Sequence, residues 1–466
     1  MTTYEFKILI DRDRVKGEYG LPGYEQEPAG EGDLQLDPLT LETVGLMNRW
    51  LSFWDRIDGS EIRRKEALLQ PITLEVLGAH LWRLILANEV GQMLKQKIPK
   101  EGKPALRLSI EFDENADATL KGLPWEFLFE PEYRWFLATK TELLLTRYVT
   151  METGRDKVRQ VGDKEKLRAL LIAALPNDEK FAAHREALWN LRTALKDVAN
   201  LEVPDPLTVW DQSEISAALE AKPYHIVHVV GICRGVPGKP EIYLGGQGDG
   251  FHDPAQFVNC LTRKGTPPRL VILQLCDYVD GDATENFERL APALIKRRVP
   301  AVLALQYAAR VGQAEHIGLG KQFYQSLIDG ELIGAAVQAS RRRLQDDHPD
   351  RRFGTPVLYL QEDGALRRPL PSAEVVKSTA GSGTSGALTI RKSLIDVVDS
   401  QQLKDDQMQP ILGWVIDLDQ HYELAEVKNL VKEKMLAPLD KTSRRVYIAM
   451  FTALGRLEQE RGNGQS

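Results

Sequence analysis

The chain has 466 residues, of which 43% are hydrophobic and 27% are charged, and its formal net charge at pH 7 is −7. This composition is typical of a globular protein with room for two or three domains. The negative charge argues against a nucleic-acid binder, because a protein that neutralises phosphates needs a basic surface. Two basic runs, Lys296–Arg298 and Arg341–Arg343, fall on predicted helices, where we expect solvated faces. We therefore expect no nucleic acid among the partners.

The chain begins with MTTYEFKILIDRDR, in which apolar and charged residues alternate. This stretch has no apolar core of signal-peptide length, and no apolar run elsewhere reaches the length of a membrane span. We therefore expect a cytoplasmic protein with no membrane partner. Residues 3–10 are predicted to form a strand. Residues 17–33 are rich in glycine, proline and acidic residues, which predicts a flexible connection.

Two long helical patterns follow, one from about Pro38 and one from about Leu74 to Lys95. The second has apolar residues at helical spacing, namely Leu77, Leu81, Leu84 and Ile85. The segments ALRLSIEFD, GLPWEFLFEP and WFLATKTELLLTRYV then look like extended chain joined by turns. Residues 1–163 are thus predicted to be an α+β part of the protein.

From residue 164 to residue 370 the pattern changes to a regular alternation of strands and helices. The strands KLRALLIAAL, YHIVHVVG, RLVILQLC, AVLALQY and TPVLYL are apolar without alternation, which is typical of strands covered on both faces. We predict a doubly wound α/β domain with a mostly parallel sheet. Its functional residues should lie at the carboxyl ends of the strands.

Residues 371–387 include STAGSGTSGA and are predicted to be a flexible linker. Residues 388–466 carry apolar residues at helical spacing and are predicted to be a small helical module. The module is either a stabilising appendage or an adaptor that binds a protein partner. The linker favours the adaptor, because it separates the module from the α/β domain.

Two predicted strands lead to residues suited to a site: HIVHVVG leads to Ile232 and Cys233, and LVILQL leads to Cys276. A predicted helix of crossover length separates them, so we expect Ile226–Val230 and Val271–Leu275 to be adjacent parallel strands with Ile232 and Cys276 at the same edge. The blocks GLPWEFLFEPEYRWFLA, YHIVHVVGICRG, RLVILQLCDYVDGD and RLAPALIKRRVPAVLALQY occur in this order, and QFYQSLIDG follows them. In these blocks the chain resembles the CHAT domain, a bacterial branch of the caspase-like cysteine peptidases that also include separase. The resemblance covers roughly residues 70–362. It implies a caspase-like fold and makes LPWEF a packing element with Trp125 in the core.

In that family the first of these strands ends in Gly-His-Gly and the second ends in a cysteine. The resemblance therefore implies a nucleophile at Cys276 and places the general base at Ile232. Isoleucine can neither draw a proton from a thiol nor give one to a leaving amine. Cys233 also replaces the family's usual glycine.

Another histidine could supply the missing base. His252 and His316 are the candidates, because each precedes or opens a helix that follows a strand and so could face the same edge. His228 lies four residues before Ile232, about 13 Å back along the strand, and His225 lies further still. We expect these two to be core or capping residues.

The cysteines also allow other interpretations. Three cysteines, Cys233, Cys260 and Cys276, are too few and too scattered for a disulfide framework, and no CxxC pair indicates zinc. Cys233 and Cys276 could form a disulfide or bind a soft metal, although two buried thiols are favoured. A buried cysteine often acts only as a small hydrophobe. We expect no cofactor and no metal.

Two functions remain open. The first is a catalytically impaired pseudopeptidase that acts as a scaffold or binding partner, within the prokaryotic stress or defence systems that the resemblance implies. The second is an active cysteine endopeptidase that uses Cys276 with a relocated histidine base. The absence of histidine at Ile232 favours the first.

Overall fold

The computed structural model describes most of the first 366 residues, and the chain splits into two compact units, Met1–Leu370 and Pro371–Ser466. The predicted linker and the predicted helical module lie outside the described residues. None of the helices in the described ranges combines the length and the apolar character needed to cross a membrane. The described residues are 4–22, 26–36, 38–53, 71–99, 105–150, 160–162, 165–209, 211–236, 239–246, 248–262, 267–277, 283–307, 319–347, 351–361, 364–366 and 431.

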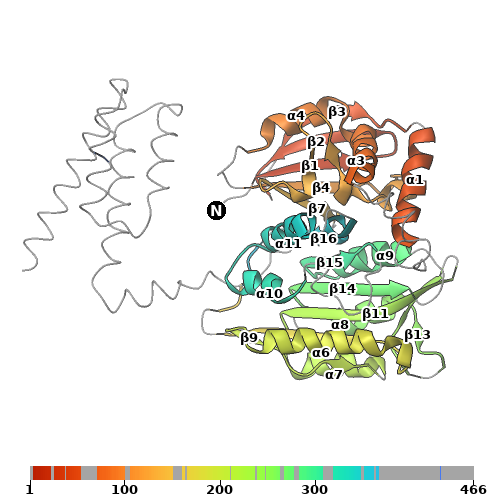
Figure 1. Cartoon of the computed structure of the whole chain (residues 1–466), viewed down its shortest axis with the longest axis vertical. Coiled ribbons are helices and arrows are strands. Elements are labelled where there is room, and N and C mark those ends of the chain that lie inside the picture. The colour runs from red at the N-terminus through yellow and green to blue at the C-terminus, as the bar shows by residue number, and fades with distance from the viewer. Residues whose placement is uncertain are drawn as a thin grey trace, which may run out of the picture. The chain divides into compact units, whose positions relative to one another are not determined.

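A single large sheet runs through the first unit, with the strand order β10-β8-β11-β14-β15-β16-β7-β4-β1-β2-β3 (Figure 1). β12, β13 and β9 pair beside this path. The strands are β1 (Glu5–Ile10), β2 (Arg14–Gly20), β3 (Glu27–Asp33), β4 (Leu106–Phe112), β7 (Leu143–Tyr148), β8 (Leu167–Ala174), β9 (Leu201–Glu202), β10 (Leu207–Thr208), β11 (Ile226–Val236), β12 (Lys239–Tyr243), β13 (Phe251–His252), β14 (Leu270–Asp277), β15 (Ala301–Leu305) and β16 (Pro356–Leu360), and a separate hairpin holds β5 (Phe129–Glu130) and β6 (Trp135–Phe136).

The sheet consists of two parallel blocks that run in opposite directions. In the first block, β10, β8, β11, β14 and β15 pair with one another in parallel. In the second block, β16, β7, β4 and β1 pair with one another in parallel. The blocks meet where β15 pairs antiparallel with β16. The carboxyl ends of the two blocks therefore lie at opposite edges of one sheet. The change of pattern predicted near residue 163 does not separate two sheets.

Helices cover both faces of the block from β8 to β15, which confirms the predicted mostly parallel α/β sheet. One face packs against α6, α10 and α11, and the other packs against α7, α8 and α9. In the amino-terminal part, a further core includes apolar residues of α1, α3 and α4. The helices are α1 (Pro38–Phe53), α3 (Pro71–Leu86), α4 (Glu89–Lys97), α5 (Ala118–Lys121), α6 (Ala182–Lys196), α7 (Gln212–Ala221), α8 (Pro254–Thr262), α9 (Ala283–Lys296), α10 (Lys321–Ile328) and α11 (Ile333–Asp347).

The predicted flexible connection over residues 17–33 is wrong, because β2 and β3 form a hairpin that extends the sheet. Its glycines permit close packing rather than flexibility. A Cβ atom at Gly17 would lie 2.4 Å from the carbonyl oxygen of Ala29, and one at Gly32 would lie 2.7 Å from the side chain of Asn88 at the start of α4. The same glycines that suggest a loop in the sequence allow α4 to approach these strands.

The basic run Arg341–Arg343 is also only partly solvated. Arg341 is 1% exposed, and its guanidinium donates hydrogen bonds to the carbonyl oxygens of Leu145 (2.9 Å) and Pro356 (2.7 Å). Burial lowers the pKa of Arg341 to about 10. α11 thus uses a cation to satisfy backbone carbonyls of β7 and β16, an arrangement that helical periodicity does not reveal.

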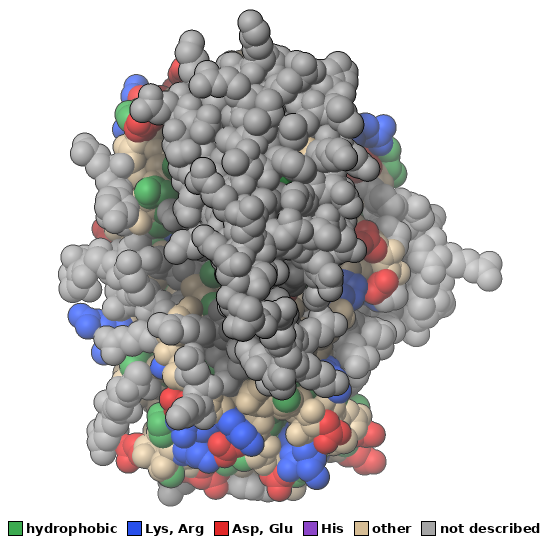
Figure 2. Space-filling model, turned by 90° about the vertical axis from the view of Figure 1, so that its left-hand side faces the viewer, with side chains coloured by type: hydrophobic (Ala, Val, Ile, Leu, Met, Phe, Trp, Pro, Cys, Tyr) green, Lys and Arg blue, Asp and Glu red, His purple; other side chains and the backbone are tan. Residues whose placement is uncertain are grey.

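Charges of both signs are mixed on part of the protein surface. In Figure 2, blue and red side chains lie side by side over the lower part of the face that is shown. Near β9, Lys222 pairs with Glu202, and Arg168 pairs with Glu165 at 2.7 Å. This described part of the face therefore carries no extended field of one sign.

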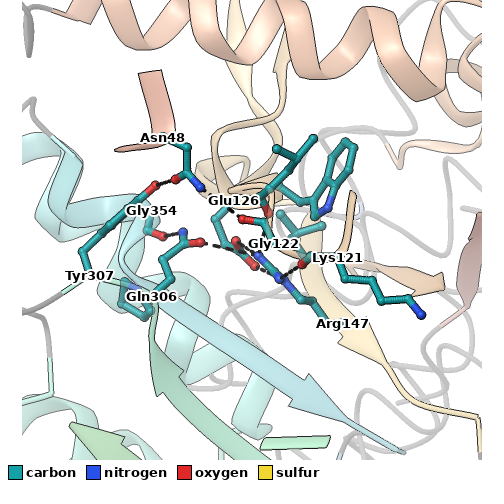
Figure 3. A network of polar contacts seen from close by, with 12 residues as sticks. Asn48, Lys121, Gly122, Glu126, Arg147, Gln306, Tyr307 and Gly354 are labelled. Carbon is teal, nitrogen blue, oxygen red and sulfur yellow. Dashed lines mark hydrogen bonds and ion pairs between the residues drawn. The ribbon is translucent and has the colours of Figure 1, made fainter. Parts of the chain in front are cut away.

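A buried ion pair of the amino-terminal block contacts the other block of the sheet through Gln306 (Figure 3). Arg147 of β7 binds both carboxylate oxygens of Glu126, at 3.1 and 2.7 Å, and both side chains are at most 3% exposed. The guanidinium also donates to the carbonyl oxygens of Lys121 and Leu123, and it lies 3.5 Å from Oε1 of Gln306. The pair is thus surrounded by partners, as two charges removed from water require.

The network continues on the other side of Gln306. Its amide donates to the carbonyl oxygen of Gly354, and the hydroxyl of the adjacent Tyr307 donates to Oδ1 of Asn48 at 2.8 Å. Asn48 in turn donates to the carbonyl oxygen of Gly122. The predicted packing role of the LPWEF block is confirmed, because Trp125 is fully buried and Glu126 is 1% exposed.

The Arg147→Met substitution should be strongly destabilising. It keeps an apolar stem but leaves the Glu126 carboxylate buried without its cation. We expect the free energy of unfolding at neutral pH, measured by urea denaturation, to fall by about 3–5 kcal/mol. In the control, Arg134→Met breaks a pair with Glu75 in which Arg134 is 68% exposed, and it should cost less than about 1 kcal/mol. Equal losses in the two variants would contradict the importance of the buried pair.

Candidate functional site

The two strands that carry the predicted site are neighbours, as expected. β11 and β14 are parallel, and the register pairs Ile232 with Cys276 (Figure 1). Both residues come at the carboxyl end of the apolar run of their strand, at one edge of the sheet. This confirms the predicted strand pairing. The side chain of Cys276 and the whole of His316 lie outside the described residues.

Ile232 is part of the hydrophobic core. Its side chain is fully buried in the core that includes α6, α10 and α11. Cys233, the next residue, is 2% exposed and belongs to the core on the opposite face, which follows from the alternation of side chains along a strand. It is a free cysteine. The position that the resemblance assigns to a base is therefore occupied by a buried hydrocarbon.

β11 does not end at Gly231. β11 continues to Val236, and Cys233 to Val236 pair antiparallel with β12. The backbone groups of β11 that extend beyond its pairing with β14 are thus satisfied by a hairpin. Arg234 fixes this arm, because its guanidinium binds Glu241 at 2.5 Å and Asp249 at 2.6 Å and lies 4.2 Å from the centre of the Phe251 ring.

His252 lies on this arm rather than beside β14. It pairs with Ile242 of β12, which pairs with Cys233 of β11, so two strands separate it from β14. Its Nε2 lies 2.7 Å from the carbonyl oxygen of Gly245, and its Nδ1 lies 3.1 Å from Oε1 of Gln256. With both ring nitrogens engaged, His252 fastens the turn between β12 and β13.

The two histidines expected to be structural are core and capping residues. His228 is fully buried, and a hydrogen bond of 2.9 Å joins its Nδ1 to the hydroxyl of Tyr324. Burial lowers the pKa of His228 to about 4, although the side chain of Gln274 opposes this effect. His225 accepts a hydrogen bond from the backbone N–H of Arg168, and burial lowers its pKa to about 4. Both imidazoles are neutral at pH 7.

Tyr307 extends the same edge towards the buried ion pair. It follows β15, the strand next to β14, and its ring is 1% exposed. Burial raises the pKa of its hydroxyl well above the ordinary value, so the hydroxyl stays protonated as a donor to Asn48. The apolar strands in the sequence predicted that this edge of the sheet carries the site. The sequence could not indicate Tyr307 or Asn48, because they are 259 residues apart.

Within the described residues, no group of three or more His, Cys, Asp and Glu side chains comes together in a way that could hold a metal ion. What the described part of the edge provides is a parallel strand pair and a rigid hairpin arm.

The low pKa of His228 predicts acid sensitivity. The pKa of His228 is 6.5 in the unfolded chain and about 4 in the folded chain. Between these two pH values the unfolded chain binds a proton that the folded chain excludes, so the protein becomes less stable as the pH falls from 6.5 to 4. The contribution of His228 should lower the free energy of unfolding by up to about 1.4 kcal/mol for each unit by which the pH falls. The His228→Gln substitution should reduce the slope between pH 6.5 and 4.5 by that amount. Urea denaturation across this range measures it, and an unchanged slope would contradict the assignment.

A protein family and a solved structure are similar to this chain. The family model of the CHAT domain matches residues 75–410, which is well over half of the chain. Among solved structures, the crystal structure of the Arg-specific cysteine proteinase gingipain R is similar with a TM-score of 0.40 and 15% sequence identity, over 61% of this chain and 69% of that chain. No curated protein matches the sequence. The chain therefore belongs to the CHAT domain family.

Proposed function

We propose that this chain is a CHAT-family pseudopeptidase, a protein with a peptidase-like site that lacks its general base and that acts by binding other proteins. One observation carries the proposal. The residue in register with Cys276 on the neighbouring strand is Ile232, and its side chain is fully buried. The prokaryotic stress or defence role that the resemblance implies is part of this proposal.

The chemistry explains why this position matters. Attack by cysteine on an amide requires the thiolate, and a thiol with an ordinary pKa near 8.5 is mostly protonated at pH 7. A neighbouring imidazole normally takes that proton and later protonates the leaving amine. Isoleucine performs neither step. A buried isoleucine also offers a bound peptide no polar contact.

An active endopeptidase with a relocated base is the alternative. His252 is a poor candidate for that base, because its ring nitrogens contact Gly245 of the hairpin arm and Gln256 of α8. His316 belongs to the connection between Tyr307, at the carboxyl end of β15, and α10, and so its segment starts at the edge where β14 ends. This position in the chain makes His316 the base to test.

The Ile232→His substitution should activate the cysteine. We expect iodoacetamide to alkylate Cys276 at pH 7 roughly tenfold faster, because an imidazole in register with it can hold a thiolate. Mass spectrometry of the peptide that contains Cys276 measures the rate. Adding Cys233→Gly should increase the effect, because glycine lets the strand adjust around the new ring.

Val230→His is the matched control. Val230 lies two residues earlier in β11, is 4% exposed and belongs to the same core, but it pairs with Gln274. An imidazole there should disturb the core equally without changing the alkylation of Cys276. Peptide cleavage by the unmodified protein that disappears in Cys276→Ala would refute the pseudopeptidase proposal. Loss of that cleavage in His316→Ala would identify the relocated base.

The partner-binding function is assigned to residues 388–466, which the linker 371–387 joins to the sheet. Removing residues 371–466 should leave the melting temperature of the remaining chain within about 2 °C of the full-length value, because an independent module does not stabilise the α/β core. Differential scanning calorimetry measures both. Unfolding of the truncated chain would show that the module is part of the core.

A further inference from the structure

A cavity of about 500 Å³ lies at the edge of the sheet opposite to Cys276. It is formed where β4, β7 and β16 end, and α9 contributes a further wall. Crevices at the carboxyl ends of parallel strands are where open α/β sheets bind ligands, and this volume is typical of small-molecule sites. The reversal at β15 and β16 thus creates a second carboxyl edge, which the CHAT assignment leaves without a role.

The interior of the cavity is largely apolar and aromatic. Phe112 ends β4, Tyr148 ends β7, and Tyr359 belongs to β16, so each of the three neighbouring strands supplies one ring. Pro292 of α9 and Val149 complete this surface. A ligand that fills the cavity therefore needs an apolar body, and a flat ring matches the aromatic lining best.

Two carboxylates and a lysine come from different walls of the cavity. Asp113 and Glu114 follow β4, whereas Lys296 ends α9, which packs beside β16. β7 lies between β4 and β16, so the two walls are about two strand spacings, or roughly 10 Å, apart. The lysine side chain is long and the carboxylate side chains are short, and they extend from opposite walls. The space between them can hold a ligand with one small charged group near each wall.

These charges are available to a ligand. In the described part of the chain, neither Lys296 nor Glu114 forms an ion pair. Asp113 accepts hydrogen bonds from Asn115 through Oδ1 alone. By contrast, the charge of Arg147, which also lines the cavity, is already balanced by Glu126. Lys121 is nearer the acidic wall, where its ammonium lies 3.5 Å from the carbonyl oxygen of Glu114.

We propose that this cavity binds a small zwitterion with an apolar or aromatic body, of the class of free amino acids. Lys296 binds the ligand's carboxylate from the α9 side. Asp113 and Glu114 bind its ammonium from the β4 side, and the rings of Phe112 and Tyr148 hold the body. The site is separate from the edge that carries Cys276, and it does not depend on whether Cys276 reacts.

The test compares three probes that share a phenyl ring. L-phenylalanine carries both charges, 3-phenylpropionate carries only the carboxylate, and phenethylamine carries only the ammonium. Ligand-observed NMR with the full-length protein should show L-phenylalanine binding, with each single-charge probe weaker by roughly fivefold (about 1 kcal/mol), which is the value of a partly exposed ion pair.

Substitutions separate the two walls. Lys296→Glu should weaken L-phenylalanine and 3-phenylpropionate roughly fivefold and spare phenethylamine, and the Asp113→Asn, Glu114→Gln double variant should show the reverse preference. Lys196→Glu is the matched control, because Lys196 is also the exposed last residue of a helix but lies on α6, away from the cavity. This substitution should leave the affinity for all three probes unchanged.

Three results would overturn the proposal. The first is that L-phenylalanine does not bind. The second is that the Lys296→Glu and Lys196→Glu variants bind L-phenylalanine with equal affinity. The third is 3-phenylpropionate binding as tightly as L-phenylalanine, which would make the site one for simple anions. Val149→Trp, which fills the cavity from its apolar side, should abolish binding of all three probes. Unchanged binding in that variant would place the probes elsewhere.

Discussion

The antiparallel pairing of β15 with β16 is the constraint on which the rest of the structure depends. It joins two parallel blocks that run in opposite directions, and so it places one set of carboxyl ends at each edge of a single sheet. One edge carries the register pair Ile232 and Cys276, and the other carries the cavity beyond β4 and β7. Within the amino-terminal block, β16 pairs parallel with β7, where the register joins Tyr359 to Arg147.

The buried ion pair of the amino-terminal block adds a contact across the β15–β16 junction. Arg147 belongs to the amino-terminal block, yet its guanidinium lies 3.5 Å from Gln306, which follows β15 in the other block. Its Cα position is level with Tyr359, whereas Gln306 lies at the opposite end of β15. The side chain therefore extends along the strand direction from the level of Tyr359 towards Gln306.

The sequence predicted those parts of the fold that depend on local pattern. β11 and β14 are continuous apolar runs, so their parallel pairing and the meeting of Ile232 with Cys276 follow from hydrophobicity and connection length. The hairpin of β2 and β3 was missed, because its glycines serve a close approach of α4 that no local pattern reveals. Arg341 was placed in solvent, because only the tertiary structure provides the carbonyls that it binds.

The sequence also predicted only part of the candidate site. Its location was predictable, since the ends of neighbouring parallel strands meet at one edge. Its surroundings were not, because they come from distant parts of the chain. The hairpin arm beyond Cys233 and the hydrogen bond between Tyr307 and Asn48 both depend on pairings that a one-dimensional pattern does not contain.

These distant pairings also determine how the chain can fold as it leaves the ribosome. Arg351 donates a hydrogen bond to the carbonyl oxygen of Leu51, 300 residues earlier, and β16 completes the sheet beside β7 only when residue 360 has been made. The amino-terminal strands must therefore wait, with an open sheet edge, while most of the protein is synthesised. Contacts so distant in sequence slow folding and prolong exposure of apolar surface. We expect this chain to require chaperone protection during synthesis more than its size alone would suggest.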